Sequence, residues 1–246
     1  MKNSLVSEIR HSVDEYGLKG RKVDSVYFGG GTPSLALPST FDAILRTISQ
    51  YCYLPIDAEI TMESTESKKL VEFRSIGINR LSLGLQSLYP KDLKLLGRDH
   101  SVEEGVKSLE MAKLMALKLA SNHVSLYELT IKSGTPIYRD YKLGRYTTPT
   151  TDTMAGMYEA TVQVAKDFGF NQYEVSSFER KEKFSKHNFG YWRGSDYLGI
   201  GPGAHGRIYN PSTATRTRTY NVCKDRDHQI LYPEEWMAQC EELGHG

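Results

Sequence analysis

Two histidines stand in a stretch of the chain that is rich in aromatic residues and glycine. His187 opens the segment His187-Asn188-Phe189-Gly190-Tyr191-Trp192, and His205 follows in the glycine-rich segment from Asp196 to Arg207. A single histidine in a loop is more often an ordinary surface or core residue than a ligand. Two histidines beside Tyr and Trp side chains are more suggestive, because aromatic walls suit a flat ligand. The stretch therefore predicts a pocket for a planar macrocycle.

A second candidate site is the run Tyr27-Phe28-Gly29-Gly30-Gly31-Thr32-Pro33-Ser34, in which a short apolar segment stops at three glycines. Glycine has no Cβ, so a ligand can approach the backbone N–H and C=O groups closely there. A plain turn between a strand and a helix is equally consistent with an isolated glycine triplet. The run lacks the G-x-G-x-x-G spacing of dinucleotide sites and the Lys of a phosphate-binding P-loop.

Three further polar side chains stand just beyond apolar segments. Glu63 follows the run from Glu59 to Met62, Gln86 follows the run from Arg80 to Leu83, and Arg98 comes a little later. The guanidinium fork of Arg98 suits a carboxylate. Taken singly, each of the three side chains would more often be a solvated surface group.

The three cysteines, Cys52, Cys223 and Cys240, are scattered, and no two lie within four residues of each other. This spacing does not form a disulfide framework, so it indicates a reducing compartment. The net charge of +1 does not indicate nucleic acid or a membrane surface as the main partner. Apolar stretches are too short for a transmembrane helix. The length of 246 residues allows one large α/β domain.

Strand-like and helix-like segments alternate over the first two-thirds of the chain. Apolar residues at helical spacing predict helices, and short apolar runs between turn residues predict strands. The predicted strands are 23–28, 58–62, 80–83, 124–127 and 172–175. The predicted helices are 5–13, 39–48, 67–76, one from 102, and 152–168. This alternation predicts a parallel sheet, open or closed into a barrel, with ligands at the carboxyl ends of the strands.

Finer features follow from single residues. Ser39 is expected to cap the second helix, and Gly77 and Gly169 are expected to end later helices in the left-handed conformation. Residues 133–151, rich in Tyr, Gly and Pro, are predicted to be a loop. Residues 215–220 alternate like an edge strand.

Taken together and in order, these motifs resemble the HemN/HemW group of radical S-adenosylmethionine (SAM) proteins, which contains oxygen-independent coproporphyrinogen oxidases and HemW-type heme chaperones. The resemblance runs from about residue 25 to residue 207 and more weakly to residue 246. The HNxxYW segment followed by GIGPGAHG is the most specific part, and it favours the heme-chaperone branch, which includes mitochondrial radical SAM domain-containing proteins.

The resemblance implies an α/β fold, a partial (βα)6 TIM-like radical SAM barrel that lacks the first and fifth strand units. Residues 1–180 would form this barrel, and 181–246 would hold the HNxxYW and GIGPGAHG segment and the start of an incomplete C-terminal module. The residues implied for SAM binding are Gly29, Gly30, Gly31, Thr32, Glu63, Gln86 and Arg98. The residues implied for heme binding are His187, Asn188, Tyr191 and Trp192, with His187 as the iron ligand.

This chain departs from the family pattern at the cysteines. The family's C-x3-C-x2-C loop supplies thiolates to a [4Fe–4S] cluster, which with SAM generates a 5′-deoxyadenosyl radical. Cys52, Cys223 and Cys240 do not match that spacing, so we expect no cluster, no metal site of this kind and no catalytic residues in this chain. The run from Met111 to Ala120 also lacks the strand that relatives have before Val124. We therefore expect a truncated chain with an internal deletion, beginning in the helix after the cysteine loop.

Two functions remain open on the resemblance. One is a heme-binding chaperone that passes heme to acceptor proteins, and the other is radical decarboxylation of coproporphyrinogen III, against which the cysteines argue. An unrelated βα enzyme whose glycine loop binds phosphate would leave the later motifs unexplained. The resemblance implies a mitochondrial location for a eukaryotic protein and a cytoplasmic one for a bacterial protein.

Overall fold

The computed structural model of this chain describes residues 1–30, 33–64, 70–83, 122–125, 130–131, 133–145, 147–167, 169–210, 215–220 and 232–243. The chain divides into two compact units. The first consists of Met1–Met62, Lys69–Asn79 and Lys186–Gly246, and the second of Glu63–Lys68 and Arg80–Ser185. The histidine-containing stretch therefore belongs to the same unit as the N-terminal elements.

Two parallel strands form the sheet of the first unit. They are β1 (Ser25–Phe28) and β2 (Glu59–Ser64), and β3 (Arg80–Leu83) follows β2 in the strand order. Side chains alternate between the two faces of a strand, so Phe28 and Tyr27 point to opposite faces of the sheet. The predicted strands at these positions are confirmed.

Helices α1 (Lys2–Glu15) and α2 (Pro38–Tyr51) pack on each other and cover the face of the sheet that bears Phe28. The Phe28 ring meets the Phe41 ring of α2 edge-on, with 4.8 Å between the ring centroids. The buried core between these elements contains Ile9, Val13, Leu18, Ile44 and Ile208. The helical stripes predicted for residues 5–13 and 41–48 are therefore confirmed.

The start of α2 differs from the prediction. Ser39 does not cap the helix, because the N-cap is Leu37 and the first helical residue is Pro38. Proline at this position has its φ already fixed in the helical range and has no N–H that needs an acceptor. The helix, preceded by the short 3-10 turn η1 (Pro33–Leu35), therefore begins without a side-chain cap.

A short helix, α3 (Leu70–Ser75), ends where the sequence predicts. Gly77 adopts a φ of +106°, which suits glycine at the end of a helix. Phe73 of α3 is buried and meets Phe41 edge-on, so α3 belongs to the same helical layer as α2. The predicted beginning of this helix at residue 67 lies outside the described residues.

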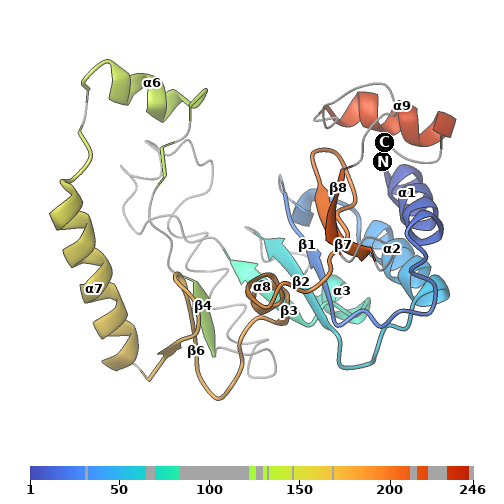
Figure 1. Cartoon of the computed structure of the whole chain (residues 1–246), viewed down its shortest axis with the longest axis horizontal. Helices are drawn as coiled ribbons and strands as arrows, with labels where there is room; N and C mark the ends of the chain where they lie inside the picture. Colours follow the sequence, from blue (N-terminus) through green and yellow to red (C-terminus); the bar gives the residue numbers. More distant parts are fainter. Residues whose placement is uncertain are drawn as a thin grey trace. The chain divides into compact units, whose positions relative to one another are not determined.

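The first unit is completed by four elements from the last third of the chain. They are α8 (Lys186–Trp192), β7 (His205–Asn210), β8 (Thr215–Tyr220) and α9 (Pro233–Leu243). β7 and β8 pair antiparallel, which confirms a strand at 215–220. α9 packs against α1, so the first and last helices lie side by side (Figure 1). Trp236 and Cys240 are the buried residues of α9.

The second unit contains a sheet with the order β4-β6-β5, formed by β4 (His123–Ser125), β5 (Asn171–Gln172) and β6 (Ser177–Glu179). Both pairings are antiparallel, so the prediction of parallel strands here is wrong. A short bend joins β5 to β6, and the Tyr173 N–H donates to the Ser177 carbonyl across it at 3.1 Å. Short connections give antiparallel pairs, whereas an apolar run does not report strand direction.

Two helices flank this sheet in the sequence. The predicted loop at 133–151 contains α6 (Pro136–Lys142), whose N-cap, Thr135, accepts a hydrogen bond from the Tyr138 N–H. Its Thr-Pro start is a helix signal that the loop prediction overlooked. The predicted helix α7 (Thr151–Asp167) is confirmed, and Gly169 beyond it has a φ of +78°.

The apolar stripe predicted for α7 is only partly buried. Ala165 is buried, but Met157 is 59% exposed and Tyr158 is also exposed. A regular apolar spacing predicts the helix itself, but it does not specify what covers the stripe. Over the ranges that the structure describes, no helix combines the length and apolar character needed to cross a bilayer.

Candidate functional site

Helix α8 lies against β1 on the face of the sheet opposite α2, and an aromatic stack joins the two elements. The His187 imidazole is stacked on the Tyr27 ring, with 4.6 Å between centroids and 9° between planes. Tyr27 reaches this face because its neighbour Phe28 occupies the other. Strand alternation therefore places one aromatic wall beneath the histidine of the HNxxYW segment.

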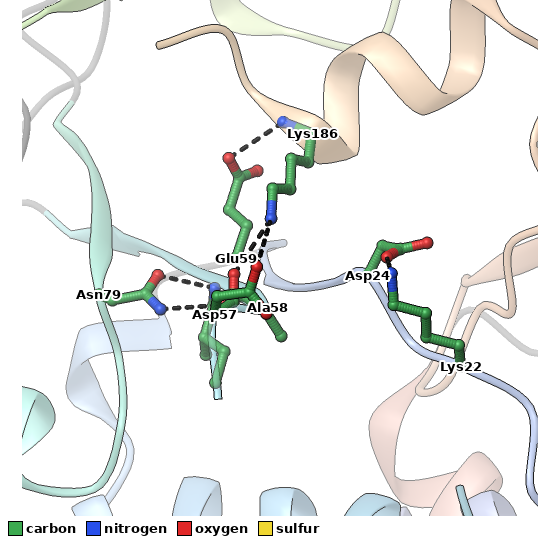
Figure 2. Close-up of polar contacts among 8 residues, drawn as sticks. Lys22, Asp24, Asp57, Ala58, Glu59, Asn79 and Lys186 are labelled. Carbon is green, nitrogen blue, oxygen red and sulfur yellow. Dashed lines mark hydrogen bonds and ion pairs between the residues drawn. The ribbon is translucent and has the colours of Figure 1, made fainter. Parts of the chain in front are cut away.

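The start of α8 is held by a carboxylate from β2. Glu59 is only 8% exposed, and its two side-chain oxygens accept hydrogen bonds from the backbone N–H groups of Lys186 (3.0 Å) and His187 (3.1 Å). These N–H groups have no acceptor within the helix, so a carboxylate here satisfies them and suits the positive end of the helix dipole. Figure 2 shows the Glu59 side chain reaching Lys186.

Asn79 fixes the beginning of β2. Its side-chain oxygen accepts from the Ile60 N–H at 2.9 Å, and its side-chain nitrogen donates to the Ala58 carbonyl at 2.7 Å (Figure 2). These two bonds flank Glu59, which occupies the position between Ala58 and Ile60. The backbone that carries the capping carboxylate is therefore tied on both sides.

Further rings extend the stack away from His187. Tyr191, one turn later on α8, meets His187 edge-on at 4.8 Å and 75°. Tyr197 meets Tyr191 edge-on at 4.7 Å, and His205 of β7 lies 6.2 Å from Tyr197. We call Tyr27, His187, Tyr191, Tyr197 and His205 the aromatic row. It presents two histidines and three phenol rings within one unit, with edge-to-face geometry typical of stable aromatic pairs.

Burial changes the ionisation of the aromatic row. Loss of solvent lowers the pKa of His187 below its usual value of 6.5, and the nearby Glu59 carboxylate opposes this to a smaller extent. Burial and the neighbouring Tyr197 raise the pKa of Tyr191. His187 is therefore a neutral imidazole at pH 7, which is the form that coordinates a metal ion.

The lowered pKa of His187 predicts a pH-dependent stability. Below pH 6.5 the unfolded chain binds a proton at this residue more readily than the folded chain, so the free energy of unfolding falls as the pH is lowered. Urea unfolding between pH 7.5 and pH 5 measures this loss, and a His187→Gln variant is expected to lose less stability over the same range. An equal loss in both proteins would contradict the assignment.

The glycine-rich loop after α8 is anchored by a buried carboxylate. Glu8 of α1 is 0% exposed and accepts hydrogen bonds from the Gly201 N–H at 2.7 Å and from the Trp236 indole N–H at 3.0 Å. The loop, α1 and α9 therefore meet at one side chain. Sequence analysis missed both Glu8 and Glu59. In each case the sequence signal was an acidic residue within an apolar pattern. Such a residue is expected to be buried, and a buried carboxylate needs hydrogen-bond partners.

The structure places the residues implied for heme binding on one short helix. His187 and Tyr191 belong to the aromatic row, Asn188 is half-buried, and Trp192 is 59% exposed at the end of the helix. Exposed aromatic surface beside a half-buried imidazole is compatible with contact to a flat apolar ligand.

The residues implied for SAM binding are described only in part. Gly29 and Gly30 directly follow β1, and Gly30 has a φ of +81°, which favours glycine. Glu63 lies in β2 and is half-buried. Gly31, Thr32, Gln86 and Arg98 lie outside the described residues.

The cysteines do not fit an iron–sulfur cluster. No two of the three cysteines have the spacing of a C-x3-C-x2-C loop. Burial raises the pKa of the Cys52 thiol and raises that of Cys240 to about 12. The Cys52 thiol lies 3.5 Å from the Leu18 carbonyl at the end of α2, and Cys240 is buried in α9. Cys223 lies outside the described residues. Within the described part of the chain, no cluster of three His, Cys, Asp or Glu side chains could hold a metal ion.

Comparison with known proteins agrees with this architecture. A sequence model of the radical SAM superfamily matches residues 2–140. The mitochondrial radical S-adenosyl methionine domain-containing protein 1 of Mus musculus is 38% identical over 277 residues, which cover 100% of this chain and 61% of the mouse protein. The heme chaperone HemW of Escherichia coli (strain K12) is 32% identical over 241 residues, 81% of this chain and 61% of HemW.

A solved structure has the same fold. The coproporphyrinogen III oxidase HemN of Escherichia coli, described as a radical SAM enzyme, superposes with a TM-score of 0.68 at 16% sequence identity. The match covers 98% of this chain and 62% of HemN. At that identity the likeness establishes the fold alone. The chain spans about three-fifths of the length of the curated relatives it matches.

Proposed function

The chain belongs to the radical SAM superfamily, and from this membership we propose that it binds heme through α8 and the aromatic row, as a HemW-like heme chaperone. The observation that carries the proposal is the stacked, half-buried and neutral imidazole of His187 within the HNxxYW segment. In this proposal His187 supplies the nitrogen to the heme iron, and Asn188, Tyr191 and Trp192 contact the macrocycle. The heme is then passed to acceptor proteins.

Burial supports His187 in this role, because a proton on the ligand nitrogen would compete with the iron for its lone pair. An imidazole whose pKa is lowered keeps its lone pair over the neutral range. Stacking on Tyr27 and edge contact with Tyr191 limit the rotation of the ring, so little side-chain freedom is lost on binding. The exposed Trp192 adds apolar surface for a flat ring.

We do not propose radical decarboxylation for this chain. Cys52 ends α2 and Cys240 lies in α9, and no two of the three cysteines have the C-x3-C-x2-C spacing of the loop that would hold the cluster and cleave SAM. We propose that SAM binds to this chain without being cleaved. The residues proposed to bind it are the glycine run from Gly29 to Thr32 together with Glu63, Gln86 and Arg98.

A partial TIM-like barrel that lacks its fifth strand unit is the proposed framework. The alignment with the mouse protein supports an internal deletion, because 277 aligned positions exceed the 246 residues of this chain by 31. The run from Met111 to Ala120, where we expect the deletion, lies outside the described residues. A mitochondrial location is proposed from the mitochondrial names of the relatives in Mus musculus, Bos taurus and Danio rerio.

Hemin titration tests the proposal. We expect the wild-type chain to give a saturable shift of the Soret band. His187→Ala is expected to weaken hemin binding by about tenfold or more, the equivalent of about 1.4 kcal/mol, because it removes the iron ligand. His11→Ala is the matched control, since His11 is a partly exposed histidine of α1 that pairs with Glu15. Absence of a spectral change with the wild-type chain would contradict heme binding, and equal affinities of the two variants would exclude His187 as the ligand.

A further inference from the structure

We propose that Glu59 is a positioning residue for His187, holding the first turn of α8 so that the imidazole stays stacked on Tyr27 and presented to the ligand. This inference rests on the proposed function of the aromatic row, and it adds a residue outside the HNxxYW segment. It follows from the two hydrogen bonds at the start of α8 and from the way β2 is tied down.

The Glu59 side chain binds the backbone of His187 directly. One carboxylate oxygen accepts from the N–H of His187 itself, and the other accepts from Lys186 immediately before it. The atom that Glu59 holds is the backbone nitrogen of His187, the same residue that carries the imidazole. Because Glu59 is buried, water competes little for these bonds.

Glu59 is itself held firmly on the sheet. It pairs with Ser25 in the parallel register of β1 and β2, and its N–H donates to the Asp24 carbonyl at 3.0 Å. Asn79 binds the backbone on either side of it, as Figure 2 shows. Tyr27 is on β1 as well, so the cap and the stacking ring of His187 come from neighbouring, hydrogen-bonded strands.

A short helix needs such a cap. α8 has seven residues, and isolated helices of that length are unstable in water because few backbone bonds offset the cost of nucleation. Lys186 adds a second tie, since its Nζ donates to the Asp57 carbonyl at 3.0 Å. Without the Glu59 carboxylate, the first turn would lose two acceptors and His187 would lose its fixed position over Tyr27.

Variants at position 59 test the inference on the ligand-free protein first. Because the His187 ring is stacked on the Tyr27 ring, we expect its ring protons to be shifted upfield. NMR of the wild-type chain measures this shift, and the signals are assigned with His187→Ala. We expect Glu59→Ala to move the shift most of the way to the value of an unstacked histidine. Glu59→Gln, which keeps one acceptor oxygen, is expected to restore part of it, and it also serves if Glu59→Ala does not fold. Asp57→Ala is the control, because it removes an exposed carboxylate near Lys186 and leaves the backbone carbonyl in place.

Hemin titration of the same variants gives the second measurement. Glu59→Ala is expected to bind hemin about fivefold more weakly than Asp57→Ala, the equivalent of about 1 kcal/mol, which is the usual cost of losing a helix cap. An unchanged ring shift in Glu59→Ala and in Glu59→Gln would overturn the inference whatever the hemin result. A wild-type chain that binds no hemin would defeat the proposed function, while the ring shifts would still decide whether Glu59 holds His187.

Discussion

Replacing Glu8 by alanine is expected to lower the free energy of unfolding by about 3 kcal/mol, because each hydrogen bond to a buried charged group contributes roughly 1.5–3 kcal/mol. The change leaves the Gly201 N–H and the Trp236 indole N–H without this acceptor in a region where Glu8 and Trp236 are both 0% exposed. It also leaves a cavity between α1 and α9. Urea unfolding followed by far-ultraviolet circular dichroism measures the loss.

Glu15→Ala is the matched control for this experiment. Glu15 lies on the same helix but pairs with His11 at the surface, and exposed pairs contribute only about 0–1 kcal/mol. In a Trp192→Phe background, Trp236 fluorescence provides a local reading, since an indole that loses a buried acceptor and gains water emits at longer wavelength. If Glu8→Ala unfolded at the same urea concentration as Glu15→Ala, the anchoring role of Glu8 would be wrong.

Gly199→Ala is expected to cost about 3 kcal/mol or more, because overpacking against a backbone that cannot move aside costs roughly 1–3 kcal/mol and at times more. A Cβ at Gly199 would lie 2.4 Å from the His205 carbonyl oxygen and 2.7 Å from its backbone nitrogen. Tyr197 and Arg207 close this loop through mutual backbone hydrogen bonds of 3.0 and 2.7 Å, so the clash cannot relax without opening the loop. Two members of the aromatic row, Tyr197 and His205, would shift.

The chain offers a close control in Gly190→Ala. A Cβ there would lie 3.6 Å from the Ser195 Cβ, an ordinary contact, and Gly190 is inside α8, where alanine is favoured by up to about 1 kcal/mol. We therefore expect Gly190→Ala to melt at the same temperature as the wild-type chain or slightly above it, and Gly199→Ala to melt well below. Similar melting temperatures for the two variants would show that the loop has room at Gly199.

Local signals in the sequence were enough to predict most elements of the first unit. Apolar spacing gave α1, α2, β1 and β2 within a few residues, and Gly77 marked the end of a helix. These features depend on residues that are close along the chain. The direction of pairing in the second unit was not predictable in this way, because β4 meets β6 across more than fifty residues and so short a strand fits either direction.

Only the HNxxYW segment of the candidate site could be predicted from the sequence. His187, Tyr191 and Trp192 stand close together in the sequence, but the partner ring Tyr27 and the cap Glu59 come from strands more than one hundred residues earlier. Nothing in the pattern around Glu59 indicates that its carboxylate caps the start of a helix at residue 186. The signal was a charged residue within an apolar strand run. It predicts that the Glu59 carboxylate is buried with a hydrogen-bond partner, but it does not indicate which residue that partner is.

The bond between Glu8 and Trp236 spans 228 residues of chain. During synthesis α1 therefore leaves the ribosome long before α9 exists, and the Glu8 carboxylate lacks its Trp236 partner until α9 emerges. Contacts so distant in sequence slow folding, because the intervening chain must be closed into a loop first. The first unit should thus complete its packing only once α9 has been made.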